Sequence, residues 1–347
     1  MKFLVNTIKG LVKKYGWKFL IIGGVGKLIS FTSVLVILGH WYGGLLSEEG
    51  AQAEIYLYPE YSLEQNLDAI EEAIDEAGGH GDRVRRVIWA RGWNERLKPG
   101  KYILSGDLSI GEAASKLATG ARESVKVVVP ASRDLAVVAG RLSAPIAADS
   151  AEVLALISPD SIRWQIIPNT YEMWWETDAA GALARLQKES AKWWNEERVG
   201  LAAAQGLTPE EAVILASIVQ AETAAPSEAP TVAGLYLNRL KKGMLLQADP
   251  TLIYAVGDPS IRRVLNEHIE IESPYNTYKY VGLPPGTIRT PEPTYIEAVL
   301  NAEDHKYIYM CAEPGGTGKH SFAVSFRDHK RNARRYQRWL NSERIYR

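Results

Sequence analysis

The sequence predicts an α+β protein with a single membrane-spanning helix at its N-terminus. Three observations support this prediction: a long run without acidic residues near the start of the chain, amphipathic segments that begin at capping boxes, and short strand-like runs bounded by glycine or proline. With 347 residues the chain can form two or three domains with their own cores. Its formal net charge of −1 indicates no nucleic-acid partner.

The N-terminal region has the composition of a membrane anchor. Five lysines lie in residues 1–18, and the apolar run 19–46 is long enough to cross a bilayer at about 1.5 Å per residue. Because lysines precede this run and acidic residues follow it, the positive-inside rule predicts a cytoplasmic basic tail over 1–18 and a transmembrane helix over 19–46. The remainder of the chain is then expected outside the cytoplasm.

Two details bear on this anchor. Trp41 and Tyr42 are expected at the membrane–water interface on the non-cytoplasmic side, because aromatic side chains are enriched at such interfaces. The alternative is a cleaved signal peptide with Ala51-Gln52-Ala53 as its cleavage site, but the apolar run is long for that role and an acidic spacer follows it. We therefore favour a retained anchor in a cytoplasmic membrane.

Residues 47–160 are predicted to form small α/β units. A strand-like run at 55–58 is followed by the capping box Ser62-Leu63-Glu64-Gln65, which begins an amphipathic helix that ends at Gly78-Gly79. A turn leads into a strand near 97–104, and Ser109 begins a short helix. No paired catalytic residues occur here, so this region suits a binding module better than an enzyme core.

A helix that ends in a carboxylate is the main chemical feature of the remaining residues, 161–347. Residues 208–211, Thr-Pro-Glu-Glu, form a capping box, and Glu222 continues the apolar stripe that starts at Leu215. Pro226 ends the helix soon afterwards, so the acid is expected at the rim of the core. It either pairs with a cation such as Arg239 or is partly buried, with a pKa raised toward neutrality that lets it donate a proton.

Several later segments contain polar or aromatic residues in loop-like settings. They are LQADPT at 246–251, YNTY at 275–278, GLPPG at 282–286, and GGTGKHSF at 315–322, which we expect to be a hairpin turn rather than a phosphate loop. Five tryptophans are candidates for a sugar-binding cleft, although core positions are the commoner use: Trp164, Trp174, Trp175, Trp193 and Trp194. The basic segment after Arg327 is expected to be a solvated helix face.

Cysteine and histidine usage indicates no metal or cofactor. The single cysteine, Cys311, lies in the apolar run 307–311 and is expected to be a core residue. The six histidines show no metal-ligand spacing.

Taken in order, these motifs resemble the membrane-anchored endolytic murein transglycosylases, the murein lytic transglycosylase G family. The resemblance covers roughly residues 165–335 and rests on IVQAET, VAGLYLNRL, LQADPT, YNTY, GLPPG and GKHSF. It implies a LysM-like region over 47–160, an α+β catalytic domain over 161–347, and peptidoglycan glycan strands as substrate. Association with peptidoglycan synthases at the bacterial inner membrane is also implied.

The resemblance further implies that Glu222 is the catalytic acid. It would protonate the glycosidic oxygen between N-acetylmuramic acid and N-acetylglucosamine and leave 1,6-anhydro ends, which terminates or releases nascent strands. Our candidates for substrate binding are Gln247, Asp249, Asn276, Tyr278 and His320. Two positions depart from the family pattern, since Ala229 stands where arginine is common and Gln220 stands where an acid is frequent.

Two alternatives remain open at this stage. A hydrolytic muramidase would need a second carboxylate to activate water, and Asp249 or Glu228 could supply it. A non-catalytic envelope scaffold would bind glycan and recruit synthesis enzymes through the membrane helix.

Overall fold

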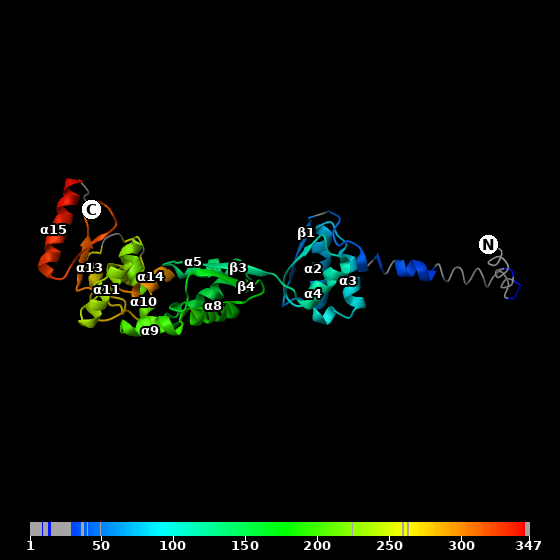
Figure 1. The fold of residues 1–347 in the computed structure, drawn as a ribbon, viewed down its shortest axis with the longest axis horizontal. Helices are drawn as coiled ribbons and strands as arrows, with labels where there is room; N and C mark the ends of the chain where they lie inside the picture. The colour runs from blue at the N-terminus through cyan, green and yellow to red at the C-terminus, as the bar shows by residue number, and fades with distance from the viewer. Residues whose placement is uncertain are drawn as a thin grey trace. The chain divides into compact units, whose positions relative to one another are not determined.

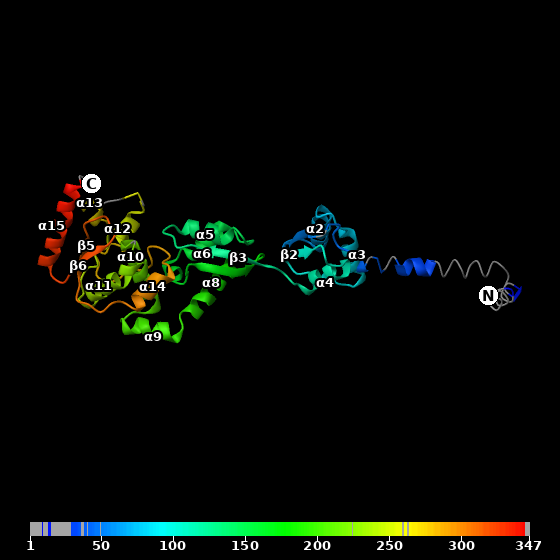
Figure 2. The same cartoon turned by 45° about the horizontal axis from the view of Figure 1, so that its top comes forward.

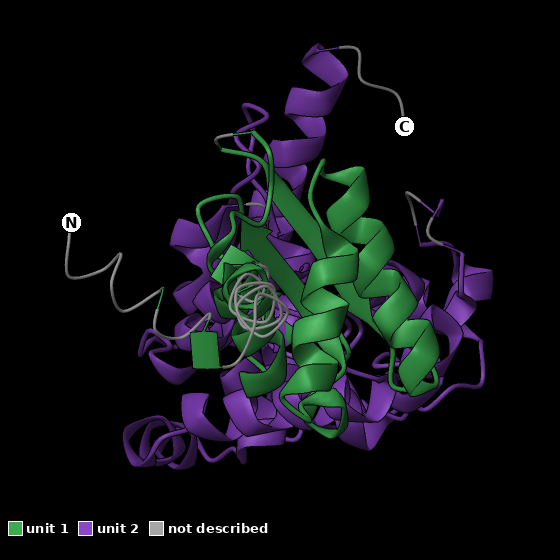
Figure 3. Ribbon diagram, turned by 90° about the vertical axis from the view of Figure 1, so that its right-hand side faces the viewer, with its two compact units in different colours: residues 1–124, 174–176 green, residues 125–173, 177–347 purple. Residues whose placement is uncertain are grey.

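The structure of the protein is a computed structural model (Figures 1 and 2), which describes residues 9, 13–14, 29–35, 38–39, 41–48, 50–223, 225–258, 260–261 and 264–343. The chain divides into two compact units (Figure 3). Unit 1 comprises residues 1–124 with 174–176, and unit 2 comprises residues 125–173 with 177–347. The domain limits expected from the sequence stay predictions, and this division differs from them in grouping residues 125–160 with unit 2.

Unit 1 is a two-stranded antiparallel sheet covered by helices. Strands β1 (Gln52–Leu57) and β2 (Gly100–Ser105) pair with Ile55 opposite Tyr102, and buried and more exposed positions alternate along both strands. The other elements are α2 (Leu63–Glu76), α3 (Gly81–Ala90), η1 (Asn94–Arg96) and α4 (Ile110–Thr119). The capping box predicted at Ser62 is confirmed, and α4 begins with another at Ser109.

The end of the predicted membrane helix belongs to unit 1. Leu45 and Leu46 are buried in the core of this unit, and Trp41 packs against it with the guanidinium of Arg91 4.0 Å from its ring. Leu45 and Leu46 therefore lie in a protein core and not in a membrane span, whereas the interfacial setting expected for Trp41 stays a prediction. Most of 1–18 and 19–40 lies outside the described residues. Among the helices that the structure describes, none has the length and apolar character needed to cross a membrane.

The first part of unit 2 has its own small core. Strands β3 (Ser124–Val129) and β4 (Asn169–Trp174) pair, and four helices accompany them: α5 (Leu135–Ser143), α6 (Ser150–Ile157), α7 (Asp160–Arg163) and α8 (Ala179–Trp193). Val127, Leu142, Ile166 and Leu186 are among the buried residues that join strands and helices into one cluster.

A helical core completes unit 2, with α10 (Pro209–Glu222) at its centre. Every residue of α10 from Ala212 to Val219 is buried, because this helix packs against α9 (Glu196–Ala204), α11 (Ala229–Lys241), α12 (Asp249–Val256) and α14 (Pro293–Leu300). The short helices η2 (Pro226–Glu228) and α13 (Asn266–Ile269) lie in the connections. The capping box predicted at Thr208 is confirmed.

A hairpin and a final helix follow. Strands β5 (Tyr309–Ala312) and β6 (His320–Ala323) pair antiparallel, which confirms the hairpin predicted around the GGTGKHSF segment. Helix α15 (Phe326–Ser342) packs on both strands (Figures 1 and 2) and buries none of its residues completely. The mixture of helices with three two-stranded sheets in the described part of the chain confirms the α+β class.

Residues 302–308, which we call the strip, connect α14 to β5 without forming a helix or strand. Asn238 of α11 donates to the carbonyl oxygens of His305 (2.7 Å) and Tyr307 (3.1 Å). The strip passes so close to α11 at Gly234 that a Cβ atom there would overlap the carbonyl oxygen of Glu303 and lie 2.8 Å from the ring of His305. Only glycine fits at this crossing without displacing the strip.

The burial of Leu45 generates a prediction about unit 1. Leu45→Ala should lower the free energy of unfolding of this unit by about 2–5 kcal/mol, because it removes a fully buried side chain. Hydrogen exchange of peptides from β1 and β2 in the full-length protein measures the change. Tyr42→Ala is the control, since Tyr42 is 71% exposed and its loss should have almost no effect. Unchanged protection in Leu45→Ala would show that residues 41–46 do not support the fold.

Candidate active site

Glu222 is the last residue of α10 and reaches a hollow at the surface of unit 2. The helix ends here because Thr223 adopts an extended conformation, with φ −122° and ψ 130°. The hydroxyl group of Tyr236, on α11, donates a hydrogen bond of 2.7 Å to Oε1 of Glu222. The acid is therefore held by the helix packed beside it and keeps partial exposure to solvent.

The surroundings of Glu222 raise its pKa to about 7. Burial is the main cause, since it disfavours the charged form, and the negative charge of Asp249 acts in the same direction. The hydrogen bond from Tyr236 and the charge of Arg239 oppose this shift but do not cancel it. The carboxyl group can therefore exchange a proton near neutral pH.

The ion pair considered between Glu222 and Arg239 is absent from the described residues. Arg239 is buried and donates instead to the carbonyl oxygens of Ile308 (2.7 Å) and Leu246 (2.6 Å). Its guanidinium thus ties α11 to two neighbouring segments. The prediction of partial burial with a raised pKa describes Glu222 correctly, and the ion-pair interpretation is wrong.

Two hollows meet at Glu222, and we call them together the groove. The Gln247 hollow has a volume of about 280 Å³, and its lining includes Gln247, Asp249, Tyr236 and Arg239. The Trp339 hollow has a volume of about 350 Å³ and is lined in part by Lys319, Tyr336, Trp339 and Leu340. Glu222, Ala312 and His320 line both. The acid therefore stands where one hollow passes into the other.

Gln247 and Asp249 lie on a loop and helix start that face Glu222. Gln247 has a φ of 49°, a left-handed conformation that is unfavourable for any residue other than glycine. Asp249 accepts a hydrogen bond from the hydroxyl of Tyr278, whose pKa is raised mainly by burial. The structure thus places Tyr278 behind Asp249, where it orients the carboxylate.

Asn276 is a correction to the predicted set. Its side chain is fully buried, and its amide group donates to the carbonyl oxygens of Ile269 and Ile271, both at 2.8 Å. Its Oδ1 accepts the backbone N–H of Tyr278 at 3.0 Å. Asn276 therefore cannot orient a sugar directly, because all its polar atoms are used to shape the loop that carries Tyr278.

Thr277 joins that loop to the one carrying Gln247. Its carbonyl oxygen accepts the N–H of Gln247 and its hydroxyl oxygen accepts the N–H of Ala248, both at 3.0 Å. The hydroxyl groups of Thr251 and Thr277 lie 2.8 Å apart. The LQADPT and YNTY motifs thus form one buried hydrogen-bonded unit beneath the Gln247 hollow.

His320 is positioned by a carboxylate from far away in the sequence. Glu228 accepts the backbone N–H of His320 at 2.9 Å and lies 3.1 Å from Nδ1 of its ring. The hydroxyl of Thr223 lies 3.4 Å from the same carboxylate. Glu228 is therefore engaged in holding the hairpin next to Glu222 and does not line either hollow.

Sequence reasoning missed the aromatic residues of the groove. Tyr336 and Trp339 are i, i+3 neighbours on α15, with ring centroids 5.7 Å apart, and both line the Trp339 hollow. The spacing of Tyr336 and Trp339 is evident in the sequence, but the arginines around them favour the prediction of a solvated helix face. The five tryptophans proposed earlier line neither hollow. Trp194, for example, is buried in the core.

These features define a class of α+β protein in which a helical core presents one carboxylic acid, with a pKa near neutrality, to a surface groove. The family model described as the YceG-like family matches residues 62–335, and the chain belongs to this family. The matched range includes every residue of the groove named above except Trp339, Tyr336 and Leu340.

Curated relatives and a solved structure agree with this membership. The chain is 37% identical over 122 residues to an endolytic murein transglycosylase of Bacillus subtilis, and 35% identical over 132 residues to one of Streptococcus pneumoniae. These segments cover 35% and 37% of this chain and only 33% and 24% of the relatives' lengths. The crystal structure of a yceG-like protein from Listeria monocytogenes has a TM-score of 0.50 at 22% identity and covers 82% of this chain and 99% of its own, so the fold is shared.

The raised pKa of Glu222 predicts a pH-dependent stability. Its carboxyl group has a higher pKa in the folded chain (about 7) than its ordinary value of 4.5, so the folded state binds the proton more tightly and loses stability as pH rises from 4.5 to 7. Glu222→Gln lacks this titration. The variant should therefore match the wild type near pH 4.5 and exceed it by roughly 1–3 kcal/mol above pH 7.

Urea unfolding at pH 4.5 and pH 8 measures this difference for the two proteins. Glu313→Gln, which removes a carboxylate from the Trp339 hollow, serves as the control. Equal stability of wild type and Glu222→Gln at both pH values would mean that the pKa of Glu222 is ordinary.

Proposed function

We propose that this protein is a lytic transglycosylase that cleaves the glycosidic bond between N-acetylmuramic acid and N-acetylglucosamine in peptidoglycan. The observation that carries the proposal is the position of Glu222, an acid with a pKa of about 7 at the junction of two hollows. Membership of the YceG-like family and the names of the curated relatives support it.

In the proposed mechanism Glu222 serves first as acid and then as base. The protonated carboxyl group donates its proton to the glycosidic oxygen as the bond from that oxygen to C1 of the muramic acid breaks. The resulting carboxylate then takes the proton of the C6 hydroxyl of the same sugar as its oxygen bonds to C1. The product is a 1,6-anhydro end, no water is consumed, and Glu222 regains its proton.

One carboxylate suffices for this reaction because the nucleophile belongs to the substrate. Hydrolysis instead requires a second carboxylate, which either activates a water molecule as a base or attacks the sugar as a nucleophile. Glu228 is occupied by His320 and lies outside the hollows, whereas Asp249 faces the groove. Asp249 is therefore the residue on which the muramidase alternative depends.

The groove also suits a polymer that is cut within its length. A hollow lies on each side of Glu222, so a glycan strand can continue past the acid in both directions. Tyr336 and Trp339 offer aromatic faces on one side, and sugar rings pack their C–H-rich faces on such surfaces. Gln247 and His320 supply polar groups on the other side and at the junction. These placements support endolytic cleavage.

We also propose that the chain is anchored in the bacterial cytoplasmic membrane by the apolar run that begins at residue 19, with both units outside the cytoplasm. The lysines before this run and the acidic residues after it support the orientation. A glycan-binding, LysM-like role for unit 1 and contact with peptidoglycan synthases belong to the same proposal. Protease digestion of intact spheroplasts tests the orientation, because it should remove units 1 and 2 and spare the N-terminal tail.

The mechanism predicts the products of cleavage. Full-length protein incubated with purified peptidoglycan should give muramic acid ends lighter by one water than hydrolysis products, as measured by mass spectrometry. Glu222→Gln should lower kcat by at least about 100-fold, because it cannot donate or accept the proton. Asp249→Asn should still give anhydro ends. Reducing ends in the wild type, lost in Asp249→Asn, would establish the muramidase instead.

The aromatic side of the groove predicts a binding role for Trp339. Trp339→Ala should raise KM about 10-fold, since it removes a stacking surface, and should change kcat little because Trp339 does not bond to Glu222. Steady-state kinetics on solubilised glycan strands measure both constants. Arg334→Ala, an exposed change on the same helix, is the control. An unchanged KM for Trp339→Ala would remove the Trp339 hollow from the substrate path.

A further inference from the structure

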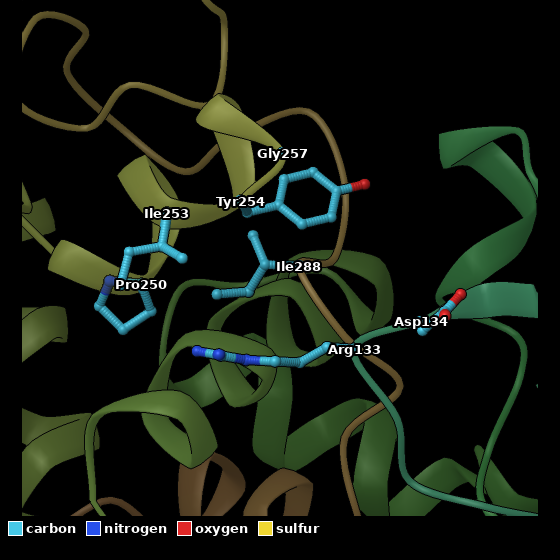
Figure 4. Close-up of a pocket in the computed structure, with 7 residues that line it drawn as sticks. All are labelled: Arg133, Asp134, Pro250, Ile253, Tyr254, Gly257 and Ile288. Atoms are coloured by element: carbon cyan, nitrogen blue, oxygen red, sulfur yellow. The ribbon is translucent and has the colours of Figure 1, made fainter. Parts of the chain in front are cut away.

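A third cavity in unit 2 lies apart from the groove. This Arg133 pocket has a volume of about 310 Å³ and shares no lining residue with either hollow (Figure 4). Its wall is formed by one side of α12, by the loop before α14 and by the segment before α5. The lining residues are Arg133, Asp134, Pro250, Ile253, Tyr254, Gly257 and Ile288.

The pocket combines an apolar wall with a cation. Pro250, Ile253, Ile288 and the ring of Tyr254 supply the apolar surface. Figure 4 shows the side chain of Arg133 passing below Ile288 toward Pro250, whereas the carboxylate of Asp134 lies away from that guanidinium group. Such a site fits a ligand that has both a small aliphatic part and a negative charge.

The charge of Arg133 is not neutralised by any ion pair between described residues. Asp134 is the acidic residue of the lining, and its Oδ1 accepts the N–H of Ala136 at 2.8 Å as the N-cap of α5. Asp160 is paired with Arg163 at 3.1 Å, and Arg163 in turn donates to the hydroxyl of Tyr254. Asp134 and Asp160 are thus engaged with groups other than Arg133.

A second guanidinium strengthens the positive potential beside this pocket. Arg289 follows the lining residue Ile288, and its Nε is buried without a hydrogen-bond partner. Burial lowers the pKa of Arg289, and the positive charge of Arg133 lowers it further, while Glu292 acts in the opposite direction to a smaller extent. The guanidinium groups of Arg133 and Arg289 repel each other. An anion bound near them would reduce this repulsion, so their proximity favours anion binding.

Helix α12 links this pocket to the groove. Asp249, its first residue, lines the Gln247 hollow, and Pro250, its second, lines the Arg133 pocket. The whole helix has eight residues and a length of about 12 Å at 1.5 Å per residue. Because adjacent residues of one short helix line the two cavities, a substituent of a few residues on a sugar bound in the Gln247 hollow can extend to the Arg133 pocket.

We propose that the Arg133 pocket binds a carboxylate of the stem peptide that branches from the glycan, and so selects peptide-bearing strands. This inference rests on the proposed function, because it takes peptidoglycan as the substrate. Stem peptides combine alanine methyl groups with free carboxylates, which matches the apolar wall and the guanidinium group. The pocket then contributes to binding without touching the reacting atoms.

Kinetics on two forms of one substrate test the proposal. Full-length protein is given glycan strands that carry stem peptides, and the same strands after an amidase has removed the peptides. Arg133→Gln should lower kcat/KM about 10-fold on the peptide-bearing strands and leave the stripped strands unaffected. Arg141→Gln, an exposed change of the same charge on α5, is the control.

Two variants at Ile253, in the pocket wall, separate the effect of a negative charge from the effect of a changed side-chain shape. Ile253→Glu and Ile253→Gln differ by one charge at nearly equal size, so the perturbation of α12 is similar in both. Ile253→Glu should show the larger loss on peptide-bearing strands, because its carboxylate repels the ligand. Equal losses on both kinds of strand, or no difference between the Glu and Gln variants, would overturn the proposal.

Direct binding distinguishes a failure of this proposal from a failure of the proposed function. In the Glu222→Gln background, calorimetry with the free stem tetrapeptide should show binding that weakens about 10-fold in Arg133→Gln, and little binding of the same peptide with its carboxylates amidated. A wild type that cleaves neither strand would refute the transglycosylase, and the peptide titration would still decide the pocket. Cleavage without peptide binding would refute the pocket alone.

Discussion

The partial burial of one carboxyl group, that of Glu222, is the constraint on which the site in the helical core depends. A buried charge is costly unless it is compensated, and the compensation here is only partial: Tyr236 donates one hydrogen bond, while the donors of Arg239 are directed to backbone carbonyls. A full ion pair would have lowered the pKa and fixed the negative charge. The incomplete compensation is what holds the acid near its titration point at neutral pH.

Other polar residues of α10 bind the segment between Ile288 and the start of α14, which forms part of the wall of the Arg133 pocket. The hydroxyl of Ser217 accepts the N–H of Ile288, and the side-chain oxygen of Gln220 accepts the N–H of Glu292 at the start of α14. Gln220, which stands where an acid is frequent in the resembled family, therefore has a structural role that an amide can perform without adding charge near Glu222. A single helix thus carries the acid at its end and also fixes the loop before α14, which favours a rigid arrangement of the two sites.

The sequence predicted those features whose signals are local. The capping box at residues 208–211, the helix that ends at Glu222 and the hairpin around His320 all follow from residues within a few positions of one another. The link between Glu228 and His320 joins residues 92 apart, and no local pattern encodes it. Asn276 was assigned to the substrate because an exposed amide and a buried one look the same in sequence, and only the fold shows that its atoms are already paired.

The close crossing at Gly234 brings the segment that leads into one wall of the groove against α11. The strip that passes over this residue continues into β5, and the β5–β6 hairpin supplies Ala312 and His320 to both hollows. Because residue 234 has only a hydrogen atom in place of a side chain, α11 and the strip that leads to this wall of the groove can lie in direct contact. A methyl group at residue 234 would push the strip away from α11. The hairpin that follows the strip would then carry His320 away from Glu222, although neither of these two residues had been altered.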